Sequence, residues 1–277
     1  MLPKPILFIL LATLSFAVMN MLAKYLSDFH PMQVIFFRTL GTVVFVLPYM
    51  IWHRIPILGT HHRMLLLRSV VGLISLATFF MAIQRMPLGS AVSIRYLGPI
   101  FGAMLAFLFL KEKITWLQWL SFAVAFSGVI VLKGFDLRID QTGLILVLTS
   151  AVTVGVVFVL IRYLATREHY LTIINYFMCI SLFFSIGFFS YFRMPVGMEW
   201  GAILSIGIFG LIGQVLMTRA FELELTSVLA PFKYMELVYA LILGFLIFGE
   251  TYSLLPFLGI LLIVSGMVMN LLGKNLN

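Results

Sequence analysis

The chain has 277 residues, of which 62% are hydrophobic and 10% charged, with a mean hydropathy of +1.14 and a formal net charge of +8. This composition lies far outside that of soluble globular domains. The basic residues are scattered among apolar stretches instead of gathered on one face, which argues against nucleic acid as a partner. A single cysteine, Cys179, excludes an intrachain disulfide and a multi-cysteine metal site.

Ten apolar segments, separated by proline, glycine and charged residues, predict an all-α fold of ten transmembrane helices. In chain order they cover residues 4–25, 31–52, 63–84, 88–110, 114–132, 141–162, 170–192, 199–221, 226–248 and 253–272. The first segment is long and lacks a cleavage site of small residues, so we expect a retained span. The stretch 133–143 is the expected linker between two units, residues 1–133 and 134–277.

The two units contain copies of one segment. Residues 82–133 and 220–271 match at a fixed offset of 138 positions. The matched pairs include Arg95 with Lys233, Tyr96 with Tyr234, Phe107 with Phe245, and Glu112 with Glu250. Because each copy has an odd number of spans, the second copy enters the membrane from the opposite side. This is the inverted repeat of secondary transporters.

Basic residues in the short loops predict the orientation, because cytoplasmic loops carry an excess of lysine and arginine. With the N-terminus inside, eight such residues fall on the cytoplasmic side and five on the outside. We therefore expect both termini in the cytoplasm.

A few charged residues lie within the spans. A charge at this depth costs several kcal/mol on most scales, so its default interpretation is functional. Arg219 and Arg68 lie near span ends, where a long side chain can reach the headgroup region, and this favours an interfacial role for both. The others are Arg38, Arg95 and Lys233, and Glu236 is the one deep acid.

Arg95 and Lys233 each lie about seven residues, or about 10 Å, inside a span. The inversion places them on either side of the midplane, so a solute with a carboxylate or phosphate fits between them. Arg38 lies at a depth similar to that of Arg95. Lys233 and Glu236 share a helix face, so a structural ion pair is an equal alternative for Lys233. In a third arrangement, Glu236 binds the ammonium of a zwitterion and Arg95 binds its carboxylate.

Proline accompanies both cations. Gly98 and Pro99 follow Arg95, and Pro231 precedes Lys233, so we expect both helices to be broken or kinked there. Further candidates for a cavity wall are Tyr96, Tyr234, Asn20, Gln33, Gln84, Asn175 and Gln214. Small residues at helical spacing predict close helix packing, at Gly98 and Gly102 and at Gly207, Gly210 and Gly213. The repeated acids Glu112 and Glu250 lie where spans end, which favours an interfacial role over binding of a coupling ion.

Several chemistries lack their motifs. There is no P-loop, so we do not expect this chain to use ATP. The five histidines lie in or near loops without metal-ligand spacing, and we expect no metal and no cofactor. No nucleophile and base meet within the spans, so an enzyme is not expected. Proton coupling would have to use Glu236, since the spans contain no chain of acids.

Three stretches resemble the drug/metabolite transporter superfamily, specifically its EamA-type ten-helix permeases. They are AKYLSDFHPMQVIFFR at 23–38, PLGSAVSIRYLGPIFGAMLAFLFLKEKITWLQWL from 87, and APFKYMELVYALILGFLIFGE at 230–250. The resemblance covers nearly the whole chain and implies a central solute path lined by the fourth and ninth spans. The chain is also similar to the branch with S-adenosylmethionine permeases. That likeness implies that Arg38, Arg68, Lys233, Tyr234 and Glu236 are residues typical of the family at their positions. Arg95 departs from the family pattern, because the residue at that position is often small and polar.

We therefore expect a secondary transporter that moves a small anionic or zwitterionic metabolite, amino-acid-like or S-adenosylmethionine-like, across a bacterial cytoplasmic membrane by alternating access. The candidate substrate-binding residues are Arg95, Lys233, Glu236, Arg38, Tyr96, Tyr234, Asn20, Gln84 and Gln214. Two alternatives remain. One is an exporter of aromatic or hydrophobic compounds in which the cations are structural, and the other is a membrane enzyme or scaffold. The expected partners are the solute and the lipid bilayer, with the protein a monomer or a homodimer.

Overall fold

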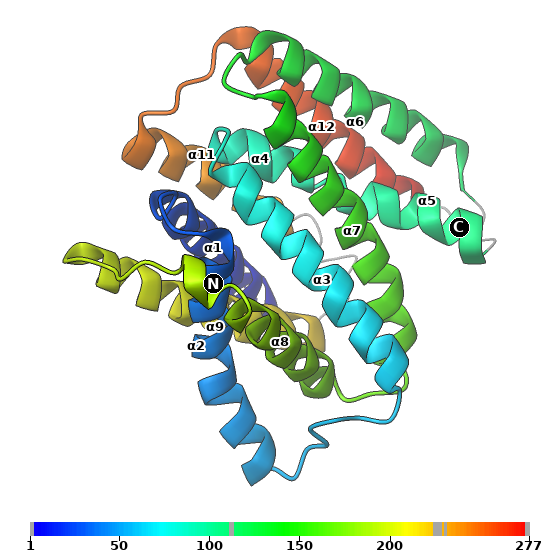
Figure 1. Ribbon diagram of the computed structural model, residues 1–277. Helices are drawn as coiled ribbons and strands as arrows, with labels where there is room; N and C mark the ends of the chain where they lie inside the picture. The colour runs from blue at the N-terminus through cyan, green and yellow to red at the C-terminus, as the bar shows by residue number, and fades with distance from the viewer. Residues whose placement is uncertain (1–2, 111–113, 224–228, 230–231, 275–277) are drawn as a thin grey trace.

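The structure is a computed structural model that describes residues 3–110, 114–223, 229 and 232–274. Within these ranges the chain is helical and has no strand (Figure 1), which confirms the all-α prediction. The helices are α1 (Lys4–Tyr25), α2 (Pro31–Trp52), α3 (His62–Ile83), α4 (Leu88–Arg95), α5 (Gly98–Leu110), α6 (Trp116–Phe135), α7 (Gln141–Ala165), α8 (Tyr170–Ile186), the short 3-10 helix η1 (Phe189–Tyr191), α9 (Met198–Leu223), α11 (Met235–Phe248) and α12 (Leu254–Lys274).

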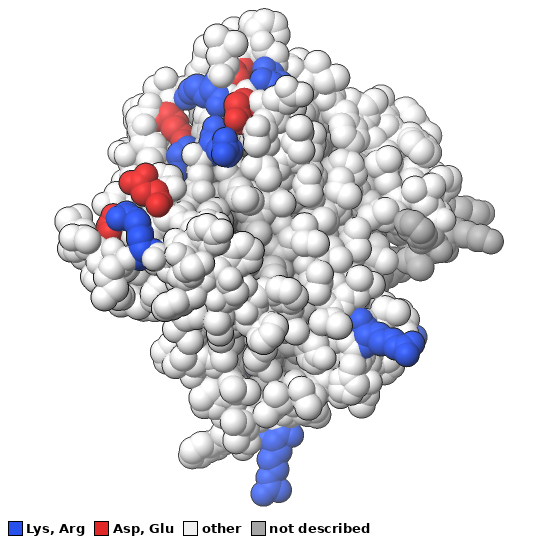
Figure 2. Space-filling model, in the orientation of Figure 1, with Lys and Arg blue, Asp and Glu red and all other residues white. Residues whose placement is uncertain are grey.

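The helices have the length and surface of a membrane protein. In the described part of the chain, seven are long and apolar enough to cross a bilayer, and three shorter apolar helices accompany them. Charged side chains lie toward the ends of the bundle and leave a broad uncharged band between them (Figure 2). Lipid tails require such a band. The prediction of ten membrane helices is confirmed.

Two predicted boundaries differ from the structure. Helix α8 ends at Ile186 instead of residue 192, because Gly187 ends the helix and Phe188 and Tyr191 turn to stack on His30 at ring distances of 5.4 and 5.5 Å. The linker is shorter than 133–143 because α6 continues to Phe135 and α7 begins at Gln141. There the side chain of Asp140 accepts a hydrogen bond from the Gly143 N–H and caps α7.

Contacts between helices follow the repeat. Helix α1 packs on α9, and their counterparts α7 and α3 pack on each other. The α2–α9 contact is likewise matched by the α8–α3 contact. The pairs α2–α8 and α6–α12 each join a helix to its own counterpart, and α4–α11 joins the fourth span to the ninth. Figure 1 shows α6 beside α12 and α3 beside α7. Because these contacts join one half to the other, the two repeats interlock around a shared core.

Both repeats contain a broken helix, as predicted. The fourth span is divided into α4 and α5 by a turn at Tyr96 and Leu97. Pro99 has no N–H to donate to the carbonyl of Arg95, four residues earlier, which is why the helical bonding lapses here. In the second repeat Tyr234, the counterpart of Tyr96, is a turn residue immediately before α11. The breaks therefore lie next to the two predicted cations.

On the face of the bundle where α3 and α8 begin, Glu168 ties two loops together. Its carboxylate accepts hydrogen bonds from the backbone N–H groups of Thr60 and His61 at 2.7 and 2.6 Å. Partial desolvation opposes the charged form, but these bonds together with those from the two side chains outweigh it and lower the pKa of Glu168 to about 2. The Glu168 carboxylate is therefore charged at neutral pH and keeps these hydrogen bonds between the two loops.

Glycines set the closest helix contacts. A Cβ added to Gly128 of α6 would lie 2.7 Å from the Gly259 carbonyl oxygen and the Ile263 nitrogen of α12. A Cβ at its repeat counterpart Gly266 would lie 2.7 Å from Ala125. A Cβ at Gly207 would lie 3.0 Å from the Gly41 Cα. Small residues thus let backbones approach, as the sequence predicted.

Substituting Gly128 with alanine should therefore force α6 and α12 apart. We expect Gly128→Ala to cost about 1–3 kcal/mol, because its Cβ meets backbone that cannot rotate away. Gly134→Ala on the same helix is the control, since nothing lies within 4 Å of the added atom. Thermal unfolding of the purified protein in detergent measures both, and equal melting temperatures for the two variants would contradict this packing.

Candidate functional site

The two helix breaks meet at the centre of the fold. Helices α4 and α11 are in contact, and the Tyr96 and Tyr234 rings pack edge to face with centroids 5.7 Å apart. The side chains of Arg95, Tyr96, Lys233, Tyr234 and Glu236 are each half-buried. The structure thus brings together five of the predicted site residues, two from the first repeat and three from the second.

Glu236 is held by hydrogen bonds from the first repeat. Its Oε1 accepts from the Asn20 Nδ2 of α1 at 2.9 Å, and its Oε2 lies 2.8 Å from the Tyr96 hydroxyl. The same hydroxyl lies 2.7 Å from the backbone carbonyl of Lys233. Tyr96 therefore bridges the acid and the broken backbone of the ninth span. Asn20 is fully buried, and its Oδ1 has no hydrogen-bond partner.

Two cations flank Glu236 without forming a close ion pair with it in the described structure. The Arg95 guanidinium lies over the Phe79 ring at 4.0 Å, and the Lys233 ammonium lies 5.8 Å from the centre of the Phe158 ring. Both charges act on Glu236, and they repel one another. One carboxylate thus faces two cations, and the site keeps an excess of positive charge.

Arg38 and Arg68 add to this excess. Both are buried, at 7% and 9% exposure. The interfacial role expected for Arg68 is wrong, because its guanidinium lies inside the bundle over the Phe177 ring, at 4.4 Å, instead of reaching a helix end. The charge of Arg38 interacts with those of Arg95 and Arg68. Arg219 is exposed, as its interfacial role requires.

The acid belongs to one repeat only. The counterpart of Glu236 is Gly98, where an added Cβ would lie 2.5 Å from the Val154 Cγ1 of α7. The counterpart of Asn20, which holds Glu236, is Phe158, which faces Lys233. A second carboxylate therefore has neither room nor a hydrogen-bond donor in the first repeat. The acid and the residue that holds it are therefore departures from the repeat.

Four predicted polar residues lie elsewhere. The Gln84 amide donates to the Phe29 carbonyl at 3.2 Å, and Gln33 exchanges hydrogen bonds with the backbone of Arg193. Asn175 is buried beside Cys179. Gln214 lines a cavity of about 260 Å³ between α2, α8 and α9, together with Tyr49, Tyr170 and Arg219. This cavity lacks Arg95, Lys233 and Glu236, so the candidate site is the group at the helix breaks instead.

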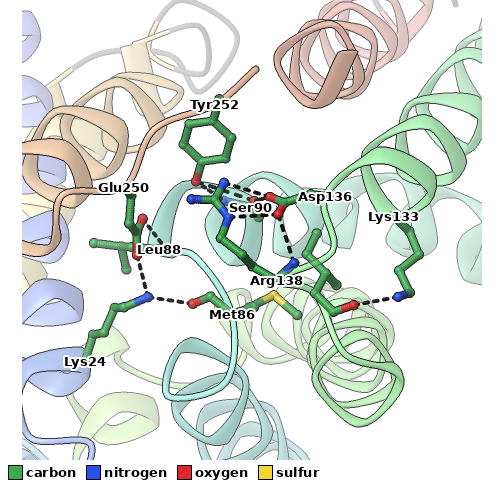
Figure 3. A network of polar contacts seen from close by, with 10 residues as sticks. Lys24, Met86, Leu88, Ser90, Lys133, Asp136, Arg138, Glu250 and Tyr252 are labelled. Atoms are coloured by element: carbon green, nitrogen blue, oxygen red, sulfur yellow. Dashed lines mark hydrogen bonds and ion pairs between the residues drawn. The ribbon is translucent and has the colours of Figure 1, made fainter. Parts of the chain in front are cut away.

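One face of the bundle is closed by a polar network that includes Glu250, and we refer to it as the Glu250 face. The Lys24 ammonium contacts the Glu250 carboxylate and the Met86 carbonyl (Figure 3), at nitrogen–oxygen distances of 2.5 and 2.6 Å. The same carboxylate accepts hydrogen bonds from the Leu88 N–H at 2.8 and 3.0 Å, and so caps the N-terminus of α4. Glu250 thus joins the end of the ninth span to the first and fourth spans.

The rest of this network consists of residues of the linker between the repeats, Ser90 of α4 and Tyr252 between α11 and α12. Arg138 donates two hydrogen bonds to Asp136, at 2.8 and 3.0 Å, and these bonds raise the pKa of Arg138. The Tyr252 hydroxyl accepts from the Ser90 N–H at 3.2 Å (Figure 3). Sequence analysis missed these residues because loop charges look solvated. The repeat alignment could have indicated the Lys24–Glu250 pair, since Lys24 and Glu250 align with Arg162 and Glu112, a cation and an acid at the same positions of the other repeat. Glu112 and the side chain of Arg162 lie outside the described residues.

No group of three or more His, Cys, Asp or Glu residues that could hold a metal ion occurs in the described part of the chain.

A family model described as the EamA-like transporter family matches residues 3–133 and again residues 141–272. The chain belongs to the EamA-like transporter family.

Full-length relatives agree with this assignment. This EamA-like transporter is 32% identical over 271 residues to the pseudopaline exporter CntI of Pseudomonas aeruginosa strain UCBPP-PA14, covering 95% of this chain and 94% of the relative. It is 25% identical to the S-adenosylmethionine uptake transporter of Rickettsia felis, covering 87% and 83%. A solved crystal structure shares the fold with a TM-score of 0.64 at 18% identity, covering 96% and 98%. The protein is therefore a membrane transporter and not an enzyme.

The Tyr96 bridge can be tested against its own repeat counterpart. Tyr96→Phe removes the donor that serves Glu236 and the Lys233 carbonyl, and we expect a loss of stability of about 1–3 kcal/mol. Tyr234→Phe should cost much less, because the Tyr234 hydroxyl makes only a long contact of 3.5 Å with the Met267 carbonyl. Thermal unfolding in detergent compares the two, and a larger loss for Tyr234→Phe would refute the bridge.

Proposed function

We propose that this transporter moves a small anionic or zwitterionic metabolite, and that Arg95, Lys233 and Glu236 bind it. The observation that carries the proposal is the unbalanced charge at the centre of the bundle. Arg38, Arg68, Arg95 and Lys233 all lie within the spans. Arg95 and Lys233 act on the Glu236 carboxylate, whereas the charge of Arg38 acts on Arg95 and Arg68. Unpaired charge in a membrane interior is costly. A negatively charged solute provides the missing partner.

The geometry also suits a solute that contains an amine. Glu236 and the unpartnered Asn20 Oδ1 form an acceptor pair for an ammonium group, while Arg95 and Lys233 provide donors for a carboxylate. A free amino acid presents both groups a few bonds apart. This class is also supported by the relatives named S-adenosylmethionine uptake transporters, since that compound carries an amino acid group.

Transport by alternating access requires that the site open to each side in turn. In this conformation Lys24, Glu250 and Leu88 close the Glu250 face, so opening it must break their contacts. We place this face outside a bacterial cytoplasmic membrane, with both termini inside, on the distribution of basic loop residues. We leave the direction open, because the relatives include both an exporter and uptake transporters.

Neutralising the central cations should abolish transport. We expect Arg95→Gln and Lys233→Gln each to reduce flux at least tenfold, because each removes a charge-assisted contact with the solute. The assay is flux of amino acids, nucleoside-like metabolites and organic acids in liposomes that contain the purified protein. Arg193→Gln, at an exposed arginine on the Glu250 face, is the control. Undiminished flux in both variants would remove these cations from the site, and folded wild-type protein that transports no compound would refute the function.

Breaking the closure should expose residues beneath it. Ser90 is fully buried under the network, so Ser90→Cys in a Cys179→Ser background should react slowly with a membrane-impermeant maleimide on intact cells. Adding Glu250→Gln removes the pair with Lys24 and should accelerate labelling severalfold. Glu199→Gln, which breaks the Arg193–Glu199 pair at 2.5 Å, is the matched control. Equal rates with Glu250→Gln and Glu199→Gln would show that Glu250 does not hold this face closed.

A further inference from the structure

Arg38 and Arg68 form a second cluster of buried charge that the site around Glu236 does not use. Arg38 comes from α2 and Arg68 from α3, and both are more than nine-tenths buried. The Arg38 Nη1 and the Arg68 Nε and Nη1 have no hydrogen-bond partner in the described structure. These are strong donors, and a buried donor without an acceptor is destabilising.

The surroundings of the two guanidinium groups do not neutralise them. The Arg38 Nε donates to the Met19 sulfur at 3.3 Å, a weak acceptor, and Arg68 lies over the Phe177 ring. Neither arginine forms an ion pair with a carboxylate of the described residues. The charges they do meet are positive, since Arg38 interacts with both Arg95 and Arg68. A structural arginine in a membrane protein normally has a carboxylate or a set of carbonyls as its partner.

A glycine packs closely against each arginine. Gly72 of α3 lies next to Arg68, where an added Cβ would be 3.3 Å from the Arg68 Nη1. Gly210 of α9 lies next to Arg38, where a Cβ would be 3.5 Å from the Arg38 Cγ. These glycines are repeat counterparts, 138 positions apart. Each half of the protein thus places a residue without a side chain against a buried guanidinium.

We propose that Arg38 and Arg68 form a second anion subsite, so that the transported solute carries two anionic oxygen groups, each a carboxylate or a phosphate. One group binds at Arg95 and Lys233 and the other at Arg38 and Arg68. Arg38 links the two subsites, because its charge acts on both Arg95 and Arg68. This inference rests on the proposed function, and it narrows the solute from any anion or zwitterion to a compound with two negative groups.

The experiment compares probes with one and two anionic groups on the purified full-length protein in detergent. Butyrate has one carboxylate, succinate has two, and 3-phosphoglycerate has a carboxylate and a phosphate. A ligand that binds the native state raises its melting temperature. At matched ionic strength, we expect succinate or 3-phosphoglycerate to produce a given shift at a concentration about tenfold or more below that of butyrate, and the better of the two identifies the second group.

Arg38→Gln and Arg68→Gln should each abolish this preference and leave the response to butyrate, whereas Arg95→Gln should weaken the response to every probe. Arg68→Lys should keep part of the preference because it keeps the charge. Without any probe, Arg68→Gln should melt at or above the wild-type temperature, since it removes an unpaired buried charge. A structural arginine would give a clear decrease instead, and that decrease would overturn the subsite.

The remaining outcomes separate the two proposals. Equal responses to butyrate and to both two-group probes, no response to either two-group probe, or a preference that survives Arg38→Gln and Arg68→Gln, would overturn the second subsite. Flux that still depends on Arg95 and Lys233 would then leave the proposed function standing. If folded wild-type protein transports none of the compounds, both proposals are overturned.

Discussion

The structure depends on how this protein keeps charge inside a membrane. A bilayer core offers no water to solvate an ion, so each buried charge needs a partner from the protein or from a solute. Among the acids that the structure describes, Glu236 is the one that reaches the centre, and it is held by Asn20 and by Tyr96 at the turn that interrupts the fourth span. The helix breaks, the packing of α4 on α11 and the position of the cations all serve this arrangement. The positive charge that remains is the feature that we propose binds the solute.

Much of this arrangement could be predicted from the sequence. The repeat offset predicted the inverted fold, and Pro99 beside Arg95 predicted the broken fourth span. Both follow from local chemistry, since Pro99 cannot donate a backbone hydrogen bond to Arg95 and a match in register needs no structure. The membrane position of Glu236 could be predicted as well, because it depends only on distance from the span ends.

The rotation of each helix could not be predicted. These helices are apolar on nearly every side, so the pattern does not say which side faces the bundle. Arg68 is close enough to a helix end to extend into the headgroups, but α3 is turned so that it points inward onto Phe177. The hydrogen bond from Asn20 to Glu236 joins residues 216 positions apart. The repeat predicts no such contact, because the residue equivalent to Asn20 is a phenylalanine.

Glu250 has a consequence for how the two sides of the membrane communicate. Its carboxylate caps α4 at Leu88, and the last residue of that short helix is Arg95. Eight helical residues form a rod about 12 Å long, too short to bend appreciably. A turn at Tyr96 and Leu97 separates this rod from α5, so it can tilt without moving the rest of the span. Helix α4 therefore connects the closure of one face at one end to Arg95, the cation that we propose binds the solute, at the other.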